Sequence, residues 1–292
     1  MTRKATMSPP TTGILGMGYL GSHLLTLFPD LFSWGTFHQT LPPKPEPTNI
    51  TWIEFQWEDS QSWNHLPQEP ATLVLTIPPV CQDIDSEVKR LVRWGQWMKK
   101  ERPQLTKMIY ISSTGVYPSQ DRTWRENDVF KPDRLSGKLR LETERVLGDF
   151  FQLFILRAGG IYGPQRHLGQ RILHHRSIST SQRPIHRIHV SDLAGIVQQY
   201  LVDERGPACV NTVDQDPKPS AEVIEWLLRN NWLNLPPGLA IPYQKRETIA
   251  EGDPGNHRLI SNHRLLHEMH YSLQFPSFRE GYARILGKSE QA

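Results

Sequence analysis

The sequence has few cysteines, no long apolar run and little net charge, and each shortage excludes a class of protein. Its two cysteines, Cys81 and Cys209, lie far apart without metal-binding or redox spacing, which favours free thiols in a reducing compartment. No run approaches the roughly 18 apolar residues that a membrane-spanning helix needs. The formal net charge is only +3 and no basic stripe is evident, so nucleic-acid binding has little support. We therefore expect a soluble cytoplasmic protein with neither a nucleic-acid nor a membrane partner.

The chain also lacks an internal repeat, and its first ten residues lack the apolar stretch of a signal peptide. Residues 1–10 are expected to form a flexible tail. The remaining length is enough for a nucleotide-binding domain of ordinary size and a smaller second lobe.

A glycine-rich turn follows the first apolar segment. Gly16, Gly18 and Gly21 form G-x-G-x-x-G, which predicts a tight turn, a close approach of backbone to a pyrophosphate, and close packing of a helix on a strand. Tyr19 and Leu20 then begin the helix, whose N-terminal N–H groups are suited to phosphates. Glycines at this spacing also occur in ordinary turns, but the strand before the motif and the helix after it favour a dinucleotide site.

The second expected strand lacks an acidic residue at its end. It runs from Trp34 to Phe37 and continues into His38, whereas NAD-binding domains carry an Asp or Glu there for the ribose 2′-hydroxyl. Since a carboxylate would repel a 2′-phosphate, its absence favours NADP over NAD. Thr36 and His38 are candidate contacts of that phosphate, although His38 also fits a solvated loop without a cofactor role.

Strands and helices alternate along the first two thirds of the chain, which is typical of an α/β fold with a Rossmann-type, doubly wound parallel sheet. Strands are expected near Thr12 to Leu15, Trp34 to Phe37, Thr51 to Phe55, Thr72 to Thr76, Lys107 to Ile111, Leu153 to Leu156 and Ala208 to Thr212. The clearest helices are Ile84 to Lys100 and Leu135 to Leu147. Thr76 and Ile77 end the fourth strand and are expected over the cofactor, unless the two prolines that follow merely terminate the strand.

Five segments resemble the extended short-chain dehydrogenase/reductase family, which includes nucleotide-sugar epimerases and dehydratases. They are Gly16 to Leu25, Ser112 to Tyr117, Leu156 to Pro164, Arg187 to Ala194, and Leu259 to Leu266 with Tyr271 and Tyr282. Together they cover nearly the whole chain in the family's order. The resemblance implies NAD(P) binding and a small-molecule substrate.

The resemblance also implies catalytic roles, one of which is vacant. Ser113, with Thr114 beside it, matches the residue that polarises the substrate oxygen, and Lys138 matches the lysine that binds the nicotinamide ribose. The acid/base tyrosine would stand four residues before that lysine, where this chain has Arg134. A guanidinium does not release its proton near neutral pH, but it can hold an anion or stabilise negative charge. The chain therefore resembles the atypical members that lack the catalytic tyrosine.

Other residues near the expected crevice have structural interpretations beside functional ones. Tyr117 and Tyr162 lie outside the family's catalytic position, and ring packing with a bonded hydroxyl is the favoured interpretation. Three arginines are candidates for a substrate phosphate or carboxylate, although each also fits the surface: Arg166, Arg171 and Arg183. Five histidines invite a metal interpretation, but they lack an acidic or cysteine partner at ligand spacing, so no metal is expected: His167, His174, His175, His186 and His189. Asp192 is interpreted as an N-terminal charge or cap of a helix.

Two functional classes remain open. The first is an NAD(P)-dependent oxidoreductase or epimerase acting on a nucleotide-sugar-like or other small polar substrate, favoured by Ser113 and Lys138. The second is a catalytically inactive dinucleotide-binding sensor or regulatory protein, favoured by Arg134. The expected Rossmann domain covers residues 11–164 and 185–216, and the smaller substrate-binding lobe covers 165–184 and 217–292. The family implies a homodimer through the helix Ile84 to Lys100, although core burial accounts better for its tryptophans.

Overall fold

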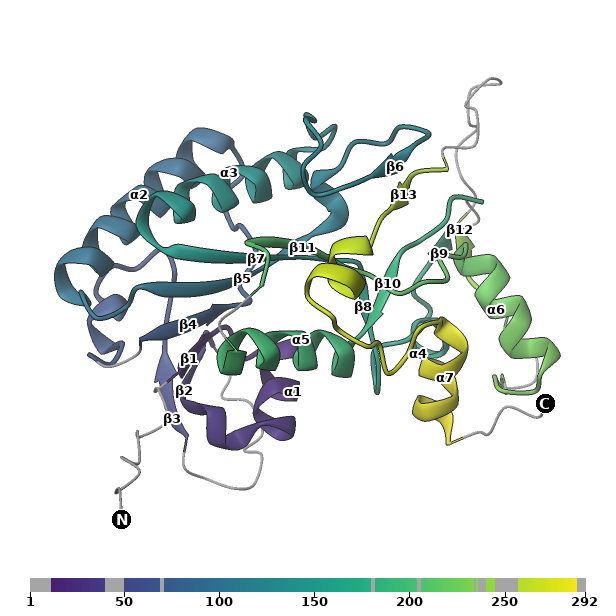
Figure 1. Ribbon diagram of the computed structural model, residues 1–292. Coiled ribbons are helices and arrows are strands. Elements are labelled where there is room, and N and C mark those ends of the chain that lie inside the picture. The colour runs from purple at the N-terminus through teal and green to yellow at the C-terminus, as the bar shows by residue number, and fades with distance from the viewer. Residues whose placement is uncertain are drawn as a thin grey trace, which may run out of the picture. The chain divides into compact units, whose positions relative to one another are not determined.

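The chain has an α/β fold built on a seven-stranded sheet (Figure 1). The computed structural model describes residues 12–39, 50–68, 71–179, 182–203, 206–233, 235, 240–244 and 257–287. Residues 1–10, the expected tail, lie outside these ranges. The strand order is β11-β7-β5-β4-β1-β2-β3. These strands are β1 (Thr12–Leu15), β2 (Phe32–Phe37), β3 (Thr51–Glu54), β4 (Thr72–Leu75), β5 (Lys107–Ser113), β7 (Gln152–Ala158) and β11 (Cys209–Thr212).

The pairings of β1 with β2, β1 with β4, β2 with β3 and β4 with β5 are all parallel. This is the strand order of a Rossmann sheet, in which β2 and β3 are added on one side of β1 and the later strands on its other side. The expected fold class is therefore confirmed, and each of the seven expected strands coincides with one strand of this sheet to within a few residues.

Seven α-helices are described: α1 (Tyr19–Leu27), α2 (Ile84–Glu101), α3 (Leu135–Phe150), α4 (Leu168–Leu173), α5 (Val190–Asp203), α6 (Ser220–Arg229) and α7 (Phe278–Leu286). Both helices expected from the sequence are present. The Asp83 carboxylate accepts a hydrogen bond from the Ser86 backbone N–H, so α2 begins at a capped N-terminus. Shorter helical turns lie at Pro29–Leu31, Ser62–His65, Thr114–Val116 and Arg264–Glu268.

Three further parallel pairs consist of short strands. They are β8 (Gly160–Tyr162) with β10 (Arg187–His189), β9 (Ile178–Ser179) with β12 (Tyr243–Gln244), and β6 (Thr123–Trp124) with β13 (Leu259–Ile260). Strands of two or three residues are too short to show a period in the sequence.

The chain divides into two compact units. The first contains Met1–Ser112, Leu135–Leu156 and Val197–Ala208, and the second contains Ser113–Arg134, Arg157–Ile196 and Cys209–Ala292. These two units are defined by how compactly their residues pack. The Rossmann domain and the substrate-binding lobe expected from the sequence are instead defined by their functions. That functional division stays a prediction.

Tryptophans fill the core of the first unit. Trp57, Trp63 and Trp94 are buried, and Trp97 is partly buried against them. The rings of Trp57 and Trp94 stack with centroids 5.0 Å apart. Core burial of these tryptophans is therefore confirmed, and the homodimer implied for α2 stays a prediction.

In the second unit, α6 and α7 share an apolar core. Leu227, Phe278 and Tyr282 are buried there, and Trp226 and Trp232 are partly buried against them. Both tryptophans therefore contribute to the core of this unit.

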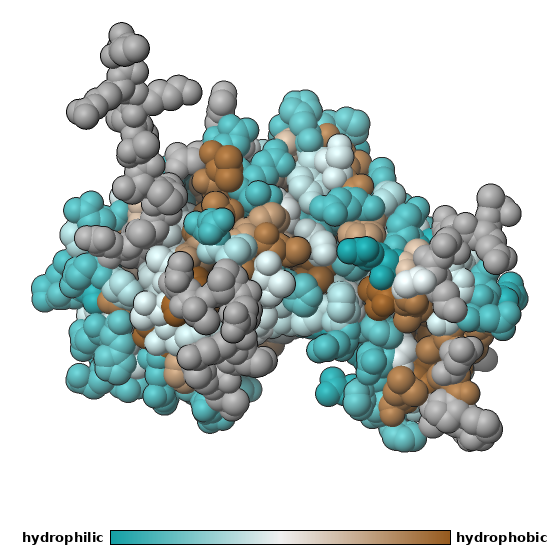
Figure 2. Space-filling view, turned by 90° about the horizontal axis from the view of Figure 1, so that it is seen from below, coloured by the Kyte–Doolittle hydropathy of each residue, from teal (hydrophilic) through white to brown (hydrophobic). Residues whose placement is uncertain are grey.

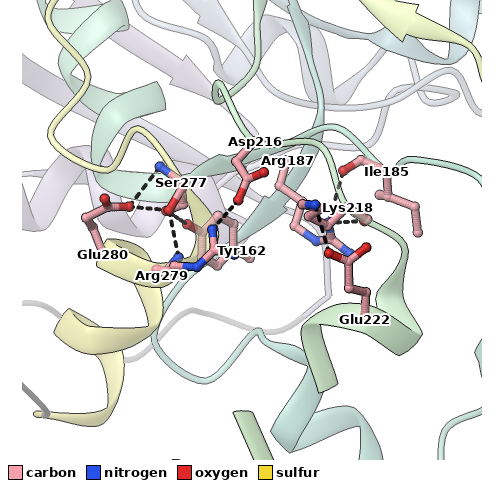
Figure 3. Close-up of polar contacts among 9 residues, drawn as sticks. All are labelled: Tyr162, Ile185, Arg187, Asp216, Lys218, Glu222, Ser277, Arg279 and Glu280. Carbon is pink, nitrogen blue, oxygen red and sulfur yellow. Dashed lines mark hydrogen bonds and ion pairs between the residues drawn. The ribbon is translucent and has the colours of Figure 1, made fainter. Parts of the chain in front are cut away.

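Polar residues surround the beginning of α7 and the strand β10 (Figure 3). Ser277 and Glu280 form a capping box at the N-terminus of α7. Arg187 is buried and donates hydrogen bonds to the backbone oxygens of Ile185, at 3.0 Å, and Lys218, at 2.7 Å. Backbone oxygens thus take the place of water as hydrogen-bond partners of this buried charged group.

The surface carries hydrophobic residues in patches between hydrophilic ones on the face that Figure 2 shows. Of the helices in the described ranges, none is both long and apolar enough to cross a membrane.

Candidate functional site

The glycine-rich turn between β1 and α1 is held by two threonines. Gly16 has φ +103°, and a Cβ on it would lie 2.6 Å from Thr76 Oγ1 and 2.8 Å from Ile77 Cγ1. Its N–H donates to Thr36 Oγ1 at 2.9 Å, and Thr76 Oγ1 donates to the Gly16 carbonyl oxygen at 2.6 Å. The turn thus needs glycine for both its backbone angle and its close packing.

The other two glycines of the motif differ in how closely other atoms approach them: Gly21 is tightly packed, and Gly18 has free space around it. A Cβ on Gly21 would lie 2.5 Å from the Gly16 carbonyl oxygen, so Gly21 permits close packing of α1 on the turn. Gly18 is exposed and is the N-cap of α1, and no atom lies within 4 Å of a Cβ built on it. The first turn of α1, including half-buried Tyr19 and buried Leu20, carries no acidic residue. This open backbone at a helix N-terminus suits an anion such as pyrophosphate.

The two expected contacts of a 2′-phosphate have different placements. Thr36 is 1% exposed and its hydroxyl accepts the Gly16 N–H, so its observed role is to hold the turn. This placement does not support its contact with a phosphate. His38 is exposed immediately after β2 and keeps that expected role.

A second group of expected site residues lies in the second unit. Ser113, Thr114 and Arg134 line one pocket of about 430 Å³. The remaining lining residues are Gly115, Gly160, Arg183, Pro184, Ile185, His186 and Arg258. Three of the four expected catalytic residues are therefore brought together within this unit. Lys138 is exposed on α3 and belongs to the first unit.

Tyr117 is buried and its hydroxyl has two partners. It donates to Asn211 Oδ1 at 2.7 Å and accepts from Arg157 Nη1 at 2.9 Å. Burial raises its pKa above the usual value of a phenol despite the charge of Arg157. This bonded and buried hydroxyl confirms the structural interpretation of Tyr117.

Tyr162 is also buried, and its hydroxyl donates to the Ser277 carbonyl oxygen at 3.3 Å. Burial raises its pKa as well, and a Cβ on Gly281 would lie only 2.0 Å from the Tyr162 hydroxyl oxygen. Tyr162 lies beside the beginning of α7, near Ser277 (Figure 3). The structural interpretation is confirmed here too.

Besides Arg134, the pocket contains one further arginine that was expected and one that was missed. Of the three arginines proposed from the sequence, Arg183 lines it, whereas Arg166 and Arg171 are exposed and are not among its lining residues. Arg258 was missed, although it immediately precedes the family-like segment that begins at Leu259. That adjacency was the available signal.

His186 lines the same pocket and is held by the backbone. Its Nε2 accepts a hydrogen bond from the Ile260 N–H at 3.0 Å. Burial, and then the positive charge of Arg258, lower its pKa to about 4. The ring is therefore neutral near pH 7. Within the ranges that the structure describes, no three His, Cys, Asp or Glu side chains group as metal ligands would.

Asp192 lies in the first turn of α5, as expected, but its carboxylate binds another segment. It accepts hydrogen bonds from the backbone N–H groups of Gln274, at 2.7 Å, and Phe275, at 3.0 Å. Besides lying at the beginning of α5, Asp192 thus binds the backbone of the segment that leads to α7. Burial raises its pKa against the effect of these bonds.

Comparison with known proteins extends these observations. No family model matches the sequence, and no curated protein matches it. A protein from Methylobacillus flagellatus, named as an NAD-dependent epimerase/dehydratase, is 25% identical, with 96% of this chain and 98% of that chain covered and a TM-score of 0.69. The dTDP-glucose 4,6-dehydratase of Bacillus anthracis, solved with NAD, is 14% identical, with 95% and 96% covered and a TM-score of 0.74.

A third structure, from Silicibacter pomeroyi, is a conserved protein of unknown function that is 21% identical over 97% of this chain and 100% of that chain, with a TM-score of 0.72. The structural neighbours thus include NAD-dependent epimerases and dehydratases and members of the short-chain dehydrogenase/reductase superfamily. The chain has the Rossmann-type α/β fold of these proteins over nearly its whole length.

Proposed function

We propose that the protein is an NAD(P)-dependent oxidoreductase or epimerase of the extended short-chain dehydrogenase/reductase type. Its substrate is a nucleotide-sugar-like or other small polar molecule, and its active site is atypical because Arg134 stands in the position of the tyrosine. NADP is favoured over NAD, since no carboxylate follows β2 to repel a 2′-phosphate. Several structural neighbours were solved with NAD, some of them together with UDP or UDP-glucose.

The observation that carries this proposal is the open space at Gly18. A dinucleotide needs a turn where backbone approaches the pyrophosphate, and Gly18 leaves that space beside a helix N-terminus without acidic residues. Gly16 and Gly21 hold the turn in place. The remaining residues proposed to contact the cofactor are Tyr19, Leu20, His38, Thr76, Ile77 and Lys138.

The proposed chemistry uses the residues of the pocket and the cofactor. A bound nicotinamide would supply or accept a hydride. Ser113 and Thr114 orient the substrate oxygen, and Arg134 stabilises negative charge that develops on it. Lys138 binds the nicotinamide ribose. The proposal assigns no proton donor, because Arg134 retains its proton and the hydroxyls of Tyr117 and Tyr162 are buried in structural bonds.

That missing proton donor favours the second candidate, a dinucleotide-binding sensor or regulatory protein without turnover. The two candidates differ in one measurable property, the chemical conversion of a substrate. The NADP⁺-loaded protein is incubated with a panel of nucleotide sugars, the absorbance of NADPH is followed, and the sugars are then analysed by chromatography. Net cofactor reduction, or conversion of a sugar into an isomer by an enzyme that returns the hydride, supports the enzyme; nucleotide binding with neither supports the sensor.

The nucleotide site itself is tested by Gly18→Asp. Gly18 has φ −78° and free space around its Cβ position, so an aspartate fits without strain and acts through its charge on the pyrophosphate. We expect the wild-type protein to bind NADPH more tightly than NADH in a fluorescence titration. We expect Gly18→Asp to weaken NADPH binding about tenfold or more, the equivalent of one unfavourable charge contact.

Gly148→Asp is the matched control, because Gly148 lies in α3 of the same unit and also has no atom within 4 Å of a built Cβ. It should bind NADPH as the wild type does. An unchanged affinity in Gly18→Asp, or no binding of either nucleotide by the wild type, would contradict the proposal.

A further inference from the structure

Three segments of the second unit bring arginines to one pocket. Arg134 precedes α3, Arg183 precedes β10, and Arg258 precedes β13, yet all three line the cavity of about 430 Å³ that contains Ser113. No aspartate or glutamate is among its described lining residues. Clusters of guanidinium groups are the usual partners of phosphates and carboxylates, which they can bind through two parallel hydrogen bonds.

The charges of these arginines act on one another. Burial lowers the pKa of Arg258, the positive charges of Arg183 and Arg134 lower it further, and Asp133 opposes them. The Asp133 carboxylate also accepts a hydrogen bond from the Ser119 backbone N–H at 2.5 Å. Guanidinium groups stay protonated near neutral pH, so the described lining of the pocket carries three positive charges. A bound anion would relieve this repulsion.

Two neutral groups complete the lining. The Ser113 hydroxyl accepts the Gly115 N–H at 3.0 Å, which leaves its own O–H to donate to a ligand oxygen. His186 accepts the Ile260 N–H and is neutral near pH 7, so it adds no charge to the pocket. Arg258 is itself positioned by a bond from Nη1 to the Tyr117 carbonyl oxygen at 2.8 Å.

We propose that the pocket binds an oxyanion of the substrate, a phosphate or carboxylate group, between Arg134, Arg183 and Arg258. The substrate is then an acidic molecule whose anionic group lies beside the oxygen that Ser113 orients. This inference rests on the proposed function for the identity of that oxygen. The arginine in the tyrosine position is thus a specificity-determining residue.

The experiment is isothermal titration of the full chain, without nucleotide, at constant ionic strength. Inorganic phosphate and malonate are the probes for the two sources of an oxyanion, and chloride is the reference. We expect one of the two probes to bind saturably. Arg134→Gln, Arg183→Gln and Arg258→Gln should each weaken that binding about tenfold or more, because each removes a charge-assisted contact.

Arg125→Gln is the matched control, since Arg125 is exposed in the same unit and is not among the pocket's lining residues. It removes the same charge from the protein and should leave binding unchanged. Arg134 is exposed, so its substitution does not threaten the fold. Arg134→Gln therefore decides the test even where Arg258→Gln unfolds.

Gly18→Asp separates this inference from the proposed function. It should lose NADPH binding and keep the binding of phosphate or malonate. Tighter binding of phosphate identifies a phosphate ester as the substrate class, and tighter binding of malonate identifies a polycarboxylate. Binding no stronger than that of chloride, or an equal loss in Arg125→Gln and Arg134→Gln, would overturn the inference while leaving the nucleotide site standing.

Discussion

Arg134 presents a guanidinium, a group that donates hydrogen bonds and has no acceptor. If it stands in the position of the family's tyrosine, as we propose, it can hold negative charge but has no lone pair with which to take up a proton. The nearest chemical substitutes would be the phenols of Tyr117 and Tyr162. Both are buried, and burial raises the pKa of each. We therefore expect Arg134 to favour anion binding over proton transfer in the pocket.

Tyr117→Phe tests the structural assignment of this phenol. Removal of its hydroxyl leaves Asn211 Oδ1 and Arg157 Nη1 without the bonds of 2.7 and 2.9 Å that they now make. We expect the free energy of unfolding to fall by about 1–3 kcal/mol, the usual cost of an unsatisfied buried polar group. Urea denaturation followed by circular dichroism measures it.

Tyr162→Phe is the comparison, because its hydroxyl makes one longer bond of 3.3 Å to a carbonyl oxygen. Its loss should be smaller than that of Tyr117→Phe. A Tyr117→Phe variant of undiminished stability that had lost cofactor turnover would instead make Tyr117 the missing acid.

At the scale of elements, β1, the glycine turn and α1 form a unit that the sequence predicted well. Strands such as β1 and β4 are short apolar runs, and α2 and α3 carry apolar faces, so local patterns were sufficient. The sequence did not reveal that Thr36 holds the glycine turn, because the burial of Thr36 depends on the pairing of β1 with β2.

Contacts between distant segments set the limit of prediction for the second unit. Arg258 joins Ser113 and Arg134 in one pocket only because β13 pairs with β6, and a strand of two residues leaves no pattern. Asp192 lies in the first turn of α5 as expected, but its second role was missed for the same reason: its partners lie some eighty residues later, at Gln274 and Phe275. Local patterns thus identified the sheet but not the arginine pocket, and the absence of the catalytic tyrosine stays a prediction.

Thr76→Val tests the link between β4 and the glycine turn. The substitution keeps the shape of the side chain and removes the hydroxyl that donates to the Gly16 carbonyl oxygen at 2.6 Å. We expect the free energy of unfolding to fall by about 1 kcal/mol, as for the loss of one hydrogen bond, with weaker NADPH binding in the same titration.

Thr26→Val is the matched control in the same unit, because the Thr26 hydroxyl also donates to a backbone oxygen, that of Ser22, but is exposed. It should change neither quantity appreciably. Equal effects of the two substitutions would show that the turn does not depend on Thr76.

At the scale of the whole molecule, buried charge makes stability depend on pH. Asp214 is 2% exposed, and burial raises its pKa from 3.8 to about 8, although the charge of Arg187 acts in the opposite direction. A carboxyl that is protonated in the native state and ionised in the unfolded state stabilises the fold only while the proton stays bound. Between pH 4 and 8 the native protein therefore holds one more proton at this group than the unfolded chain does.

Asp214→Asn tests this linkage, because the amide resembles the protonated carboxyl but does not titrate. The wild type's contribution from Asp214 is fully present below pH 3.8 and is lost as the pH rises through about 8. Its free energy of unfolding should fall across this interval by up to about 1.4 kcal/mol per pH unit, the value for one proton. Asp214→Asn should remove that part of the slope, as measured by urea denaturation at several pH values. Asp128→Asn, which breaks the 3.2 Å ion pair with Arg122 in the same unit and does not involve a charge that shifts the pKa of Asp214, should keep the slope. If the slope were unchanged in Asp214→Asn, the ionised carboxylate would already be accommodated beside Arg187, and the pKa of Asp214 would be low.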